Sequence, residues 1–204
     1  MKKLQDILYR SGITEINGSI DINISTIEFD SRKVIKGSLF IAVKGTQVDG
    51  HDYIKQAITN GATTIICEYI SEDLIRPEPV TFVVVKNSST ALGKIAAAYY
   101  DHPSNDMKII AITGTNGKTT VASLLYQLFK KSGYKTGLLS TVQILVDTTV
   151  FNATHTTPDS VTINYYLHQM VLLGVDYCFM EVSSHGIHQK RTEGLEFAGG
   201  IFTN

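Results

Sequence analysis

The chain has 204 residues, enough for one large or two small domains. Its 43% hydrophobic and 18% charged residues are typical of a soluble globular protein. The net charge of −1 argues against nucleic acid as the main partner, and no apolar run reaches the roughly 18 residues that span a membrane. Cys67 and Cys178 fall in predicted buried strands, so we expect free thiols in a reducing cytoplasm and no disulfide.

The first part of the chain predicts a small mixed α/β domain over residues 1–87. A short helix is expected within residues 1–12, and alternating apolar and polar residues predict a strand at Ile20–Ile27. Buried apolar runs and helical spacing complete this domain, with strands at residues 37–43, 63–67 and 80–85 and a helix at residues 51–60.

Residues 88–204 predict a second domain in which strands and helices alternate. This pattern indicates a doubly wound parallel sheet of the phosphate-loop ATPase type, truncated after residue 204. The expected helices cover residues 91–100, 118–131 and 157–173, and the expected strands cover residues 109–112, 136–140, 177–182 and 197–204. Residues 143–147 and 149–153 are expected to pair as a hairpin.

A glycine-bounded turn follows the apolar run Ile109–Ile112 and opens an amphipathic helix. Gly114 and Gly117 let the backbone wrap closely around a ligand, and a helix N-terminus attracts phosphate. Lys118 is placed to reach the β- and γ-phosphates of a nucleotide, and the Thr119 hydroxyl is placed to hold Mg²⁺.

The spacing of this loop departs from the standard phosphate loop, which has four residues between its glycines. Its first glycine would then fall at position 112, which is Ile; the chain instead has Gly114-Thr-Asn-Gly-Lys-Thr-Thr120. The alternative is an ordinary strand-to-helix turn with a surface lysine. That alternative does not account for two glycines followed by Lys-Thr-Thr, so we predict a nucleotide-phosphate site.

Glu181 ends a hydrophobic strand, and ligands of open α/β sheets bind beyond the carboxyl ends of strands. A carboxylate there could coordinate Mg²⁺ shared with ATP. The residues alone leave two alternatives open, a solvated strand-end glutamate and a pair with Lys118.

Thr156 and Thr157 precede Pro158 and Asp159 at the start of a predicted helix. Taken alone, they are helix-capping residues, with Thr at the N-cap and Pro at the first helical position. The N-terminus of the same helix favours an anionic group, so these threonines can cap the helix and also contact an anionic ligand. His185 lies in a predicted loop, where a local hydrogen bond is a better interpretation than a general base.

Three stretches carry a resemblance to a known family. Gly114–Thr120 resembles the ATP loop of the Mur ligases and the folylpolyglutamate synthetases. His155-Thr-Thr-Pro-Asp159 and Met180-Glu-Val-Ser-Ser-His-Gly-Ile187 resemble the Mur ligase branch that adds the third amino acid to the peptidoglycan stem peptide. The three motifs occur in the family's order, and the resemblance covers nearly the whole chain.

The resemblance implies an ATP-dependent amide ligase that adds diaminopimelate or lysine to UDP-MurNAc-L-Ala-D-Glu through an acyl phosphate. It assigns catalytic roles to Lys118 and Glu181, and a Mg²⁺ ion to Thr119 and Glu181. The implied ATP-binding residues are Gly114, Thr115, Asn116, Gly117, Lys118, Thr119 and Thr120.

The resemblance also implies a site for the UDP-sugar peptide. In the second domain it points to Thr156, Thr157, Ser183 and Arg191, with His155 as a neighbour. A guanidinium suits bidentate capture of phosphate or carboxylate, and the alternative for Arg191 is a surface charge.

In the first domain the resemblance points to Ser31, Thr46 and Gln47 as contacts for uracil or ribose. Turn formation explains these residue types equally well. Thr46 also stands where some relatives carry histidine.

Residues 197–204 read as a strand entering a loop, so we expect the chain to be the front part of a longer one. In the family, a metal-binding histidine, a carbamoylated lysine and the amino-acid-binding domain follow. A module that binds the UDP-precursor or ATP without catalysis is therefore an alternative, as is another Mur-type or folylpolyglutamate-type ligase. The first domain argues against a folate ligase. The oligomeric state is open, and a monomer is expected.

Overall fold

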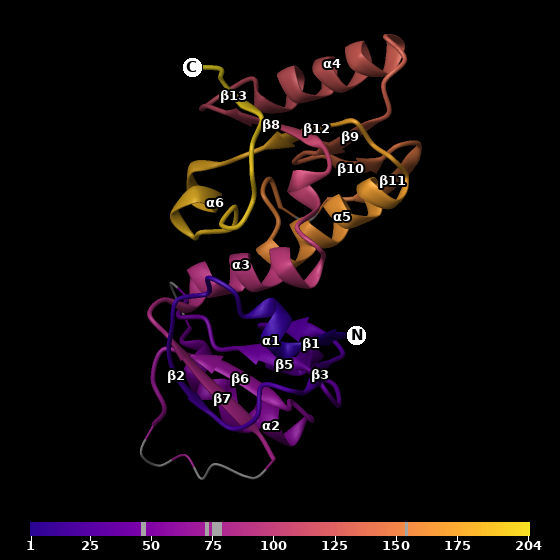
Figure 1. Cartoon of the computed structure of the whole chain (residues 1–204). Coiled ribbons are helices and arrows are strands. Elements are labelled where there is room, and N and C mark those ends of the chain that lie inside the picture. The colour runs from indigo at the N-terminus through magenta and orange to yellow at the C-terminus, as the bar shows by residue number, and fades with distance from the viewer. Residues whose placement is uncertain (46–47, 72–73, 75–78, 154) are drawn as a thin grey trace. The chain divides into compact units, whose positions relative to one another are not determined.

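The computed structural model describes the chain except residues 46–47, 72–73, 75–78 and 154. It divides into two compact units, Met1–Tyr99 and Tyr100–Asn204. The predicted boundary lies after residue 87, whereas helix α3 (Ser88–Tyr99) belongs to the first compact unit, where it packs against α1 (Leu4–Ile7). Figure 1 shows the helices and strands of each unit.

The first unit is built on a five-stranded mixed sheet in the order β2-β7-β6-β5-β4. Strands β4 to β7 run parallel, and β2 pairs antiparallel with β7. Its strands are β2 (Ile13–Asn17), β4 (Ile27–Glu28), β5 (Leu39–Ile41), β6 (Thr64–Cys67) and β7 (Thr81–Val85). All residues of β5 and β6 are buried, which explains why all of them except Thr64 are apolar. The small mixed α/β unit is as predicted.

The expected strand Ile20–Ile27 is wrong as a single element. Its residues form β3 (Asn23–Ile24), which pairs with β1 (Lys2–Lys3), and β4, which pairs with β5. Ser25 lies between the two short strands and bonds elsewhere, its amide to the Gly37 carbonyl and its carbonyl to the Tyr99 hydroxyl. The chain therefore leaves one sheet and enters another within this stretch.

The helix expected at residues 51–60 begins with a 3₁₀ turn, η2 (Gly50–Tyr53), and continues as α2 (Ile54–Thr59). Asp49 caps this turn, because its carboxylate accepts a 3.0 Å hydrogen bond from the His51 amide. Within residues 1–12, only the four residues of α1 are helical.

The second unit contains a six-stranded sheet in the order β11-β10-β9-β12-β8-β13. Strands β9, β12, β8 and β13 are parallel, whereas β10 and β11 form the predicted antiparallel hairpin. Its strands are β8 (Lys108–Thr113), β9 (Thr136–Leu139), β10 (Gln143–Val146), β11 (Thr149–Asn152), β12 (Tyr177–Glu181) and β13 (Gly199–Phe202). Its helices are α4 (Lys118–Lys131), α5 (Ser160–Leu172) and α6 (Ser184–His188).

Helices cover both faces of this sheet, with α4 on one face and α5 on the other (Figure 1). Alternate residues of the central strand β12 pack against the helices on the two faces of the sheet. Cys178 and Met180 pack in the cluster with α5, and Phe179 packs in the cluster with α4. The doubly wound architecture is therefore confirmed.

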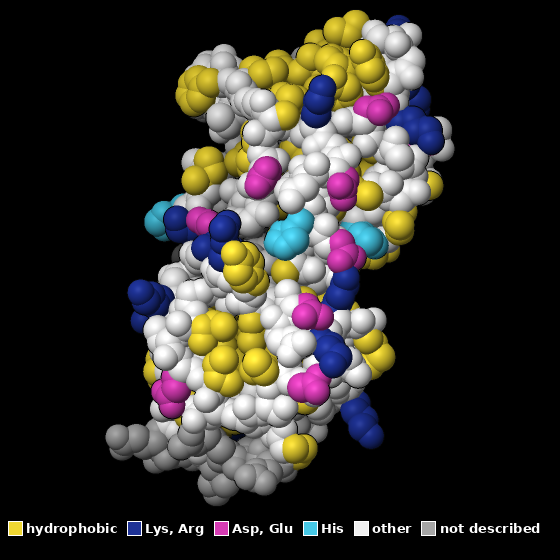
Figure 2. All heavy atoms as spheres, viewed as in Figure 1, with side chains coloured by type: hydrophobic (Ala, Val, Ile, Leu, Met, Phe, Trp, Pro, Cys, Tyr) yellow, Lys and Arg dark blue, Asp and Glu magenta, His cyan; other side chains and the backbone are white. Residues whose placement is uncertain are grey.

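The outer side of α4 carries large apolar side chains. Leu124 and Leu128 are 60% and 58% exposed, and Figure 2 shows hydrophobic atoms gathered over this helix. Among the described residues, no helix combines the length and apolar character that crossing a membrane requires. Cys67 and Cys178 are free and buried, as predicted.

Candidate functional site

The glycine-bounded turn joins the central strand β8 to α4. Gly114 and Gly117 have φ angles of 132° and 82°, which side chains with a Cβ rarely adopt. A Cβ at Gly114 would also clash with the Thr203 side chain, which follows β13. Both glycines are therefore required by the backbone, and the loop lies at the carboxyl edge of the sheet, as predicted.

Lys118 is the first residue of α4, and its side chain folds back over the loop. Its Nζ donates to the Gly114 carbonyl at 2.7 Å and to the Thr115 carbonyl at 3.1 Å. The sequence left open an ion pair between Lys118 and Glu181, but the two side chains do not pair among the described residues. The lysine is thus held beside the loop, and its ammonium forms no ion pair with a carboxylate of the described residues.

The Glu181 carboxylate is fully buried at the end of β12, so the alternative of a solvated glutamate is wrong. It accepts hydrogen bonds from the Thr119 hydroxyl (3.1 Å), the Thr141 hydroxyl (3.0 Å) and the Thr141 amide (3.0 Å). Within the described part of the chain, no lysine, arginine or histidine pairs with it. An ionised carboxylate without a cation is costly to bury, so this position suits a bound cation.

The donor set agrees with a Mg²⁺ site. The Thr119 hydroxyl and the Glu181 carboxylate lie within hydrogen-bond distance of each other. Both offer oxygen atoms as metal ligands, and Mg²⁺ prefers oxygen ligands. Across the residues that the structure describes, no group of three or more His, Cys, Asp or Glu side chains could hold a metal ion.

Sequence reasoning missed three residues that shape this site. Thr141 holds the Glu181 carboxylate, as described above. Thr203 donates to the Asn116 carbonyl at 2.6 Å, and the Asn204 side-chain oxygen accepts from the Thr115 and Asn116 amides at 3.0 and 2.9 Å. These contacts span 40 to 89 residues of sequence, so only the folded sheet brings the groups together.

A second cluster lies on the loops that follow β12 and precede α5. The Thr157 hydroxyl is buried, lies 3.1 Å from the Ser183 hydroxyl, donates to the Glu181 carbonyl at 3.2 Å and accepts from the Ser183 amide at 3.0 Å. Ser183 in turn accepts from the Gly186 amide at 3.1 Å and caps α6. The structure therefore brings Thr157 and Ser183 together next to Glu181, while Thr156 lies partly buried beside them.

The expected role of Thr157 as helix cap is wrong. The cap of α5 is Asp159, whose carboxylate accepts from the Thr162 amide at 2.9 Å. The Thr157 hydroxyl is left for the contact with Ser183. His185 lies on the short helix α6 and not in a loop. His155 is exposed.

Arg191 is anchored rather than a loose surface charge. Its guanidinium donates to the Thr157 carbonyl and, at 2.9 and 2.6 Å, to the Gln189 side-chain oxygen. Its own carbonyl accepts from the Ser160 hydroxyl at 3.0 Å. The positive charge is therefore fixed beside Thr157, without a carboxylate partner among the described residues.

The first unit has a pocket of about 680 Å³ at the ends of β4 and β5. Ser31 lies in its wall, nearly buried, and donates to the Gln56 side-chain oxygen at 2.7 Å. The rings of Phe29, Phe40 and Tyr53 also line it. Thr46 and Gln47 lie outside the described residues.

Asp30 and Arg32 lie in the wall of this pocket, and His51 lies close by in sequence but outside its lining. Arg32 grips Asp30 with two hydrogen bonds of 2.9 and 2.8 Å, and these bonds hold the pKa of the Asp30 carboxyl below its usual value. His51 bridges two segments, because one ring nitrogen lies 2.6 Å from the Asp49 carboxylate and the other accepts from the Glu68 amide at 2.9 Å.

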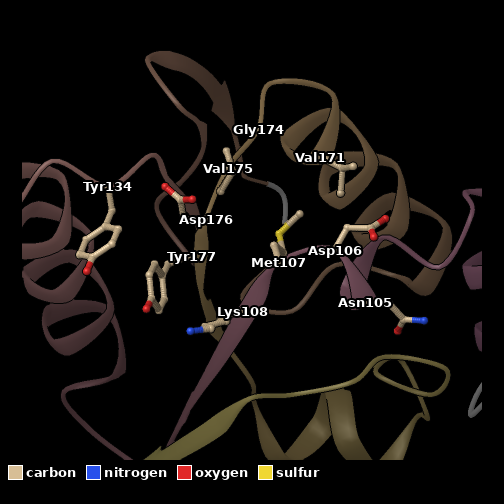
Figure 3. A pocket seen from close by; sticks show the side chains of 10 residues that line it. All are labelled: Asn105, Asp106, Met107, Lys108, Tyr134, Val171, Gly174, Val175, Asp176 and Tyr177. Carbon is tan, nitrogen blue, oxygen red and sulfur yellow. The ribbon is translucent and has the colours of Figure 1, made fainter.

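Another pocket, of about 570 Å³, lies at the opposite edge of the second sheet (Figure 3). Lys108 and Tyr177 open the adjacent strands β8 and β12 there, and Tyr134 contacts Tyr177 edge to face. Because ligands of open α/β sheets bind beyond the carboxyl ends of the strands, this pocket is not the candidate site.

A glycine-bounded loop between a central parallel strand and a helix, beside a threonine hydroxyl and a buried carboxylate, defines a nucleotide-binding α/β domain. Two family models match the chain. The Mur ligase middle domain matches residues 112–204, and the Mur ligase family catalytic domain matches residues 23–100. The chain belongs to the Mur ligase family, which confirms the resemblance.

Several curated relatives bear the name UDP-N-acetylmuramoyl-L-alanyl-D-glutamate--2,6-diaminopimelate ligase. The relative from Cytophaga hutchinsonii is 49% identical over 202 residues, which cover 99% of this chain and 41% of the relative. The relative from Clostridium tetani is 40% identical, with 99% and 42% covered. The chain thus spans about two fifths of the length of the relatives it matches.

Solved structures agree on the fold. A structure of a ligase with that same name aligns over 100% of this chain and 40% of its own, with a TM-score of 0.79 and 24% identity. A MurF structure from Acinetobacter baumannii aligns over 79% of this chain and 31% of its own, with a TM-score of 0.53 and 24% identity.

Proposed function

We propose that the protein containing this chain is an ATP-dependent amide ligase that joins diaminopimelate to UDP-MurNAc-L-Ala-D-Glu. The names of relatives that are 40–49% identical across the chain support this substrate pair. They favour diaminopimelate over lysine, which the sequence alone left open. Because Cys67 and Cys178 are free thiols, we propose a reducing compartment, the cytoplasm.

The second unit would bind ATP at the loop between β8 and α4. The backbone of Gly114, Thr115, Asn116 and Gly117 would wrap around the phosphates, and the first amides of α4, at Lys118, Thr119 and Thr120, would donate to them. Lys118 already lies against this loop, and rotation of its side chain would bring the ammonium to the phosphate chain.

Thr119 and Glu181 would hold Mg²⁺. When bound, the ion neutralises charge on the phosphates during phosphoryl transfer. The chain's own contribution is geometric, because Thr119 is fixed in the first turn of α4 and Glu181 at the end of β12. The contact between these two residues is the observation that carries the proposal.

The UDP-sugar peptide would bind on two surfaces. Thr156, Thr157, Ser183 and Arg191 would contact it in the second unit, where the anchored guanidinium suits an anionic group. In the first unit, the pocket around Ser31 offers aromatic rings and polar groups for a uracil ring. Thr46 and Gln47, which flank this pocket in sequence, stay predictions.

The proposed reaction is the one that the resemblance to the Mur ligases implies. The D-glutamate carboxylate attacks the γ-phosphorus of ATP, giving an acyl phosphate and ADP. The amine of diaminopimelate attacks the acyl carbon, phosphate leaves, and the amine proton passes to solvent or phosphate. The enzyme would accelerate both steps by holding the reactants together and by neutralising charge with Lys118.

The test uses the protein in its full natural length. ADP release should require both UDP-MurNAc-L-Ala-D-Glu and diaminopimelate, and Lys118→Ala should lower it by about 1,000-fold. Lys131→Ala, at the exposed far end of the same helix, is the matched control and should leave turnover unchanged. Full activity of Lys118→Ala would refute the proposal. Binding of both ligands without ADP release by the unmodified protein would favour a non-catalytic binding module.

A further inference from the structure

Thr141 makes contacts that the proposed function does not yet use. Its amide donates to one Glu181 carboxylate oxygen, Oε1, and its hydroxyl donates to the other, Oε2, both at 3.0 Å. The Thr119 hydroxyl donates to the same Oε2 at 3.1 Å. Two threonine hydroxyls therefore bracket one carboxylate oxygen, and both oxygens are held.

The segment that carries Thr141 is itself fixed. Thr141 lies in the tight connection between β9 and β10, next to Ser140. The Ser140 hydroxyl donates to the Gln143 carbonyl at 2.8 Å and accepts from the Gln143 amide at 3.2 Å. Ser140 is nearly fully buried. These bonds close the turn and fix its backbone, so the position of Thr141 relative to Glu181 is fixed as well.

The number of bonds at Glu181 also matters. A carboxylate has about four lone-pair positions, and three donated hydrogen bonds leave one for a cation. Two contacts from one residue fix both the position and the rotation of the carboxylate plane. Without the Thr141 hydroxyl, Oε2 would be held by Thr119 alone, which would itself have to turn toward the ion.

We propose that Thr141 is a positioning residue, which orients the Glu181 carboxylate for Mg²⁺ bound together with ATP. This inference rests on the proposed function of the loop and Glu181. Thr141 acts through Glu181 and is assigned no contact with substrate. Groups that orient metal ligands commonly change metal affinity by about 10- to 100-fold when they are removed.

Two substitutions separate the hydroxyl from the shape of the side chain. Thr141→Val keeps the volume and the amide but removes the hydroxyl, whereas Thr141→Ser keeps the hydroxyl. Thr149→Val is the matched control, since Thr149 is an exposed threonine on β11 of the same unit. Thr141 is exposed as well, so valine there fits without repacking a core.

The first measurement is the affinity for Mn²⁺ in the presence of a non-hydrolysable ATP analogue, with electron paramagnetic resonance as the readout of binding. Thr141→Val should weaken Mn²⁺ binding by about 10- to 100-fold, Thr141→Ser by less than about twofold, and Thr149→Val not at all. The second measurement is turnover against Mg²⁺ concentration. Thr141→Val should need correspondingly more Mg²⁺, with KM for the UDP-sugar peptide unchanged.

The outcomes distinguish the two proposals. If the unmodified protein binds no Mn²⁺ with the ATP analogue, the proposed metal site fails and the role of Thr141 fails with it. If the unmodified protein binds Mn²⁺ and Thr141→Val binds it equally well, only the positioning role is overturned. Thermal unfolding is measured for each variant. Should Thr141→Val fold poorly, Thr141→Ala removes the same hydroxyl, and unchanged Mn²⁺ binding would overturn the positioning role equally.

Discussion

The Thr119 hydroxyl donates a 3.1 Å hydrogen bond to the Glu181 carboxylate, although 62 residues separate the two in sequence. One residue opens α4 and the other closes β12, so the contact joins two elements at the carboxyl edge of the sheet. This pair is the centre of the proposed ATP and Mg²⁺ site, and it makes Glu181 the first residue to test.

Glu181→Gln should separate folding from metal binding. Glutamine keeps an oxygen for the Thr141 amide, and its NH₂ group can donate to the Thr119 and Thr141 hydroxyls, which can rotate to accept. We therefore expect the free energy of unfolding to change by less than about 1 kcal/mol, because the polar contacts persist. ADP release should fall by about 100-fold, since the charge that attracts Mg²⁺ is gone. Glu193→Gln, at a surface ion pair, is the control. Wild-type Mg²⁺ dependence in Glu181→Gln would contradict the assignment.

Gly186→Ala should disturb the cluster around Thr157. A Cβ at Gly186 would lie 2.8 to 3.0 Å from three Thr157 side-chain atoms, so Thr157 would have to move away from Ser183. We expect a loss of about 1–3 kcal/mol in urea unfolding, together with weaker binding of the UDP-sugar peptide.

Gly200→Ala is the matched control for this change, because the nearest atom to its Cβ, the Ala111 carbonyl oxygen, lies 3.8 Å away. Equal effects of the two substitutions on ligand binding would argue against a specific role for the Thr157 cluster.

The two cysteines should resist thiol reagents while the protein is folded. Burial raises the pKa of Cys67 and of Cys178 to about 12, so the thiolate fraction at pH 8 is about 10⁻⁴. Reaction with Ellman's reagent at pH 8 should be negligible in buffer and should reach two thiols per chain in urea. Rapid stoichiometric reaction of the folded protein would contradict this burial.

The same raised pKa values predict how stability changes at alkaline pH. The unfolded thiols ionise from about pH 8.5, whereas the folded thiols stay protonated. Their contribution is therefore complete below about pH 8.5 and is lost as the pH rises toward 12. Urea midpoints measured between pH 7 and 10 should fall, and cysteine-to-serine variants should show a smaller fall.

Asp30 should titrate at lower pH than a free aspartate, because the Arg32 guanidinium donates two hydrogen bonds to its carboxylate. Arg32→Gln should raise the pKa of Asp30 toward its ordinary value of 3.8, as measured by NMR titration of the carboxyl carbon. Lys33→Gln should cause a smaller rise, since Lys33 acts only through its charge.

A folded pKa below the unfolded one stabilises the protein above pH 3.8, and this contribution disappears as the pH falls through the folded pKa. Arg32 is 81% exposed, so the effect should shrink in high salt. Identical Asp30 titration in Arg32→Gln would contradict the role of the guanidinium.

The second sheet could be predicted because its signals are local. The apolar run at Ile109–Ile112 and the helical spacing after Lys118 each identify one element without reference to the rest of the chain. The first unit was harder. β2 (Ile13–Asn17) is a strand with three exposed residues, one of which is Ile16, so its apolar pattern is weak and it was missed.

The helix cap before α5 shows why local signals can mislead. Thr156, Thr157 and Asp159 are all good capping residues, and sequence alone does not rank them. Asp159 takes the cap because Thr157 is drawn into the bonds with Glu181 and Ser183. Thr141 could not be found from motifs, because its partner lies 40 residues away and no fixed spacing links them.

The order of the strands also bears on how the protein is made. β8 precedes the phosphate loop, yet both of its sheet neighbours, β12 and β13, come later in the chain. Thr115 likewise finds its Asn204 partner only 89 residues downstream. During translation, the loop therefore leaves the ribosome long before the segments that hold it in shape. While the first unit can assemble from strands already synthesised, the nascent chain should gain affinity for nucleotide only after β13 has emerged and paired with β8.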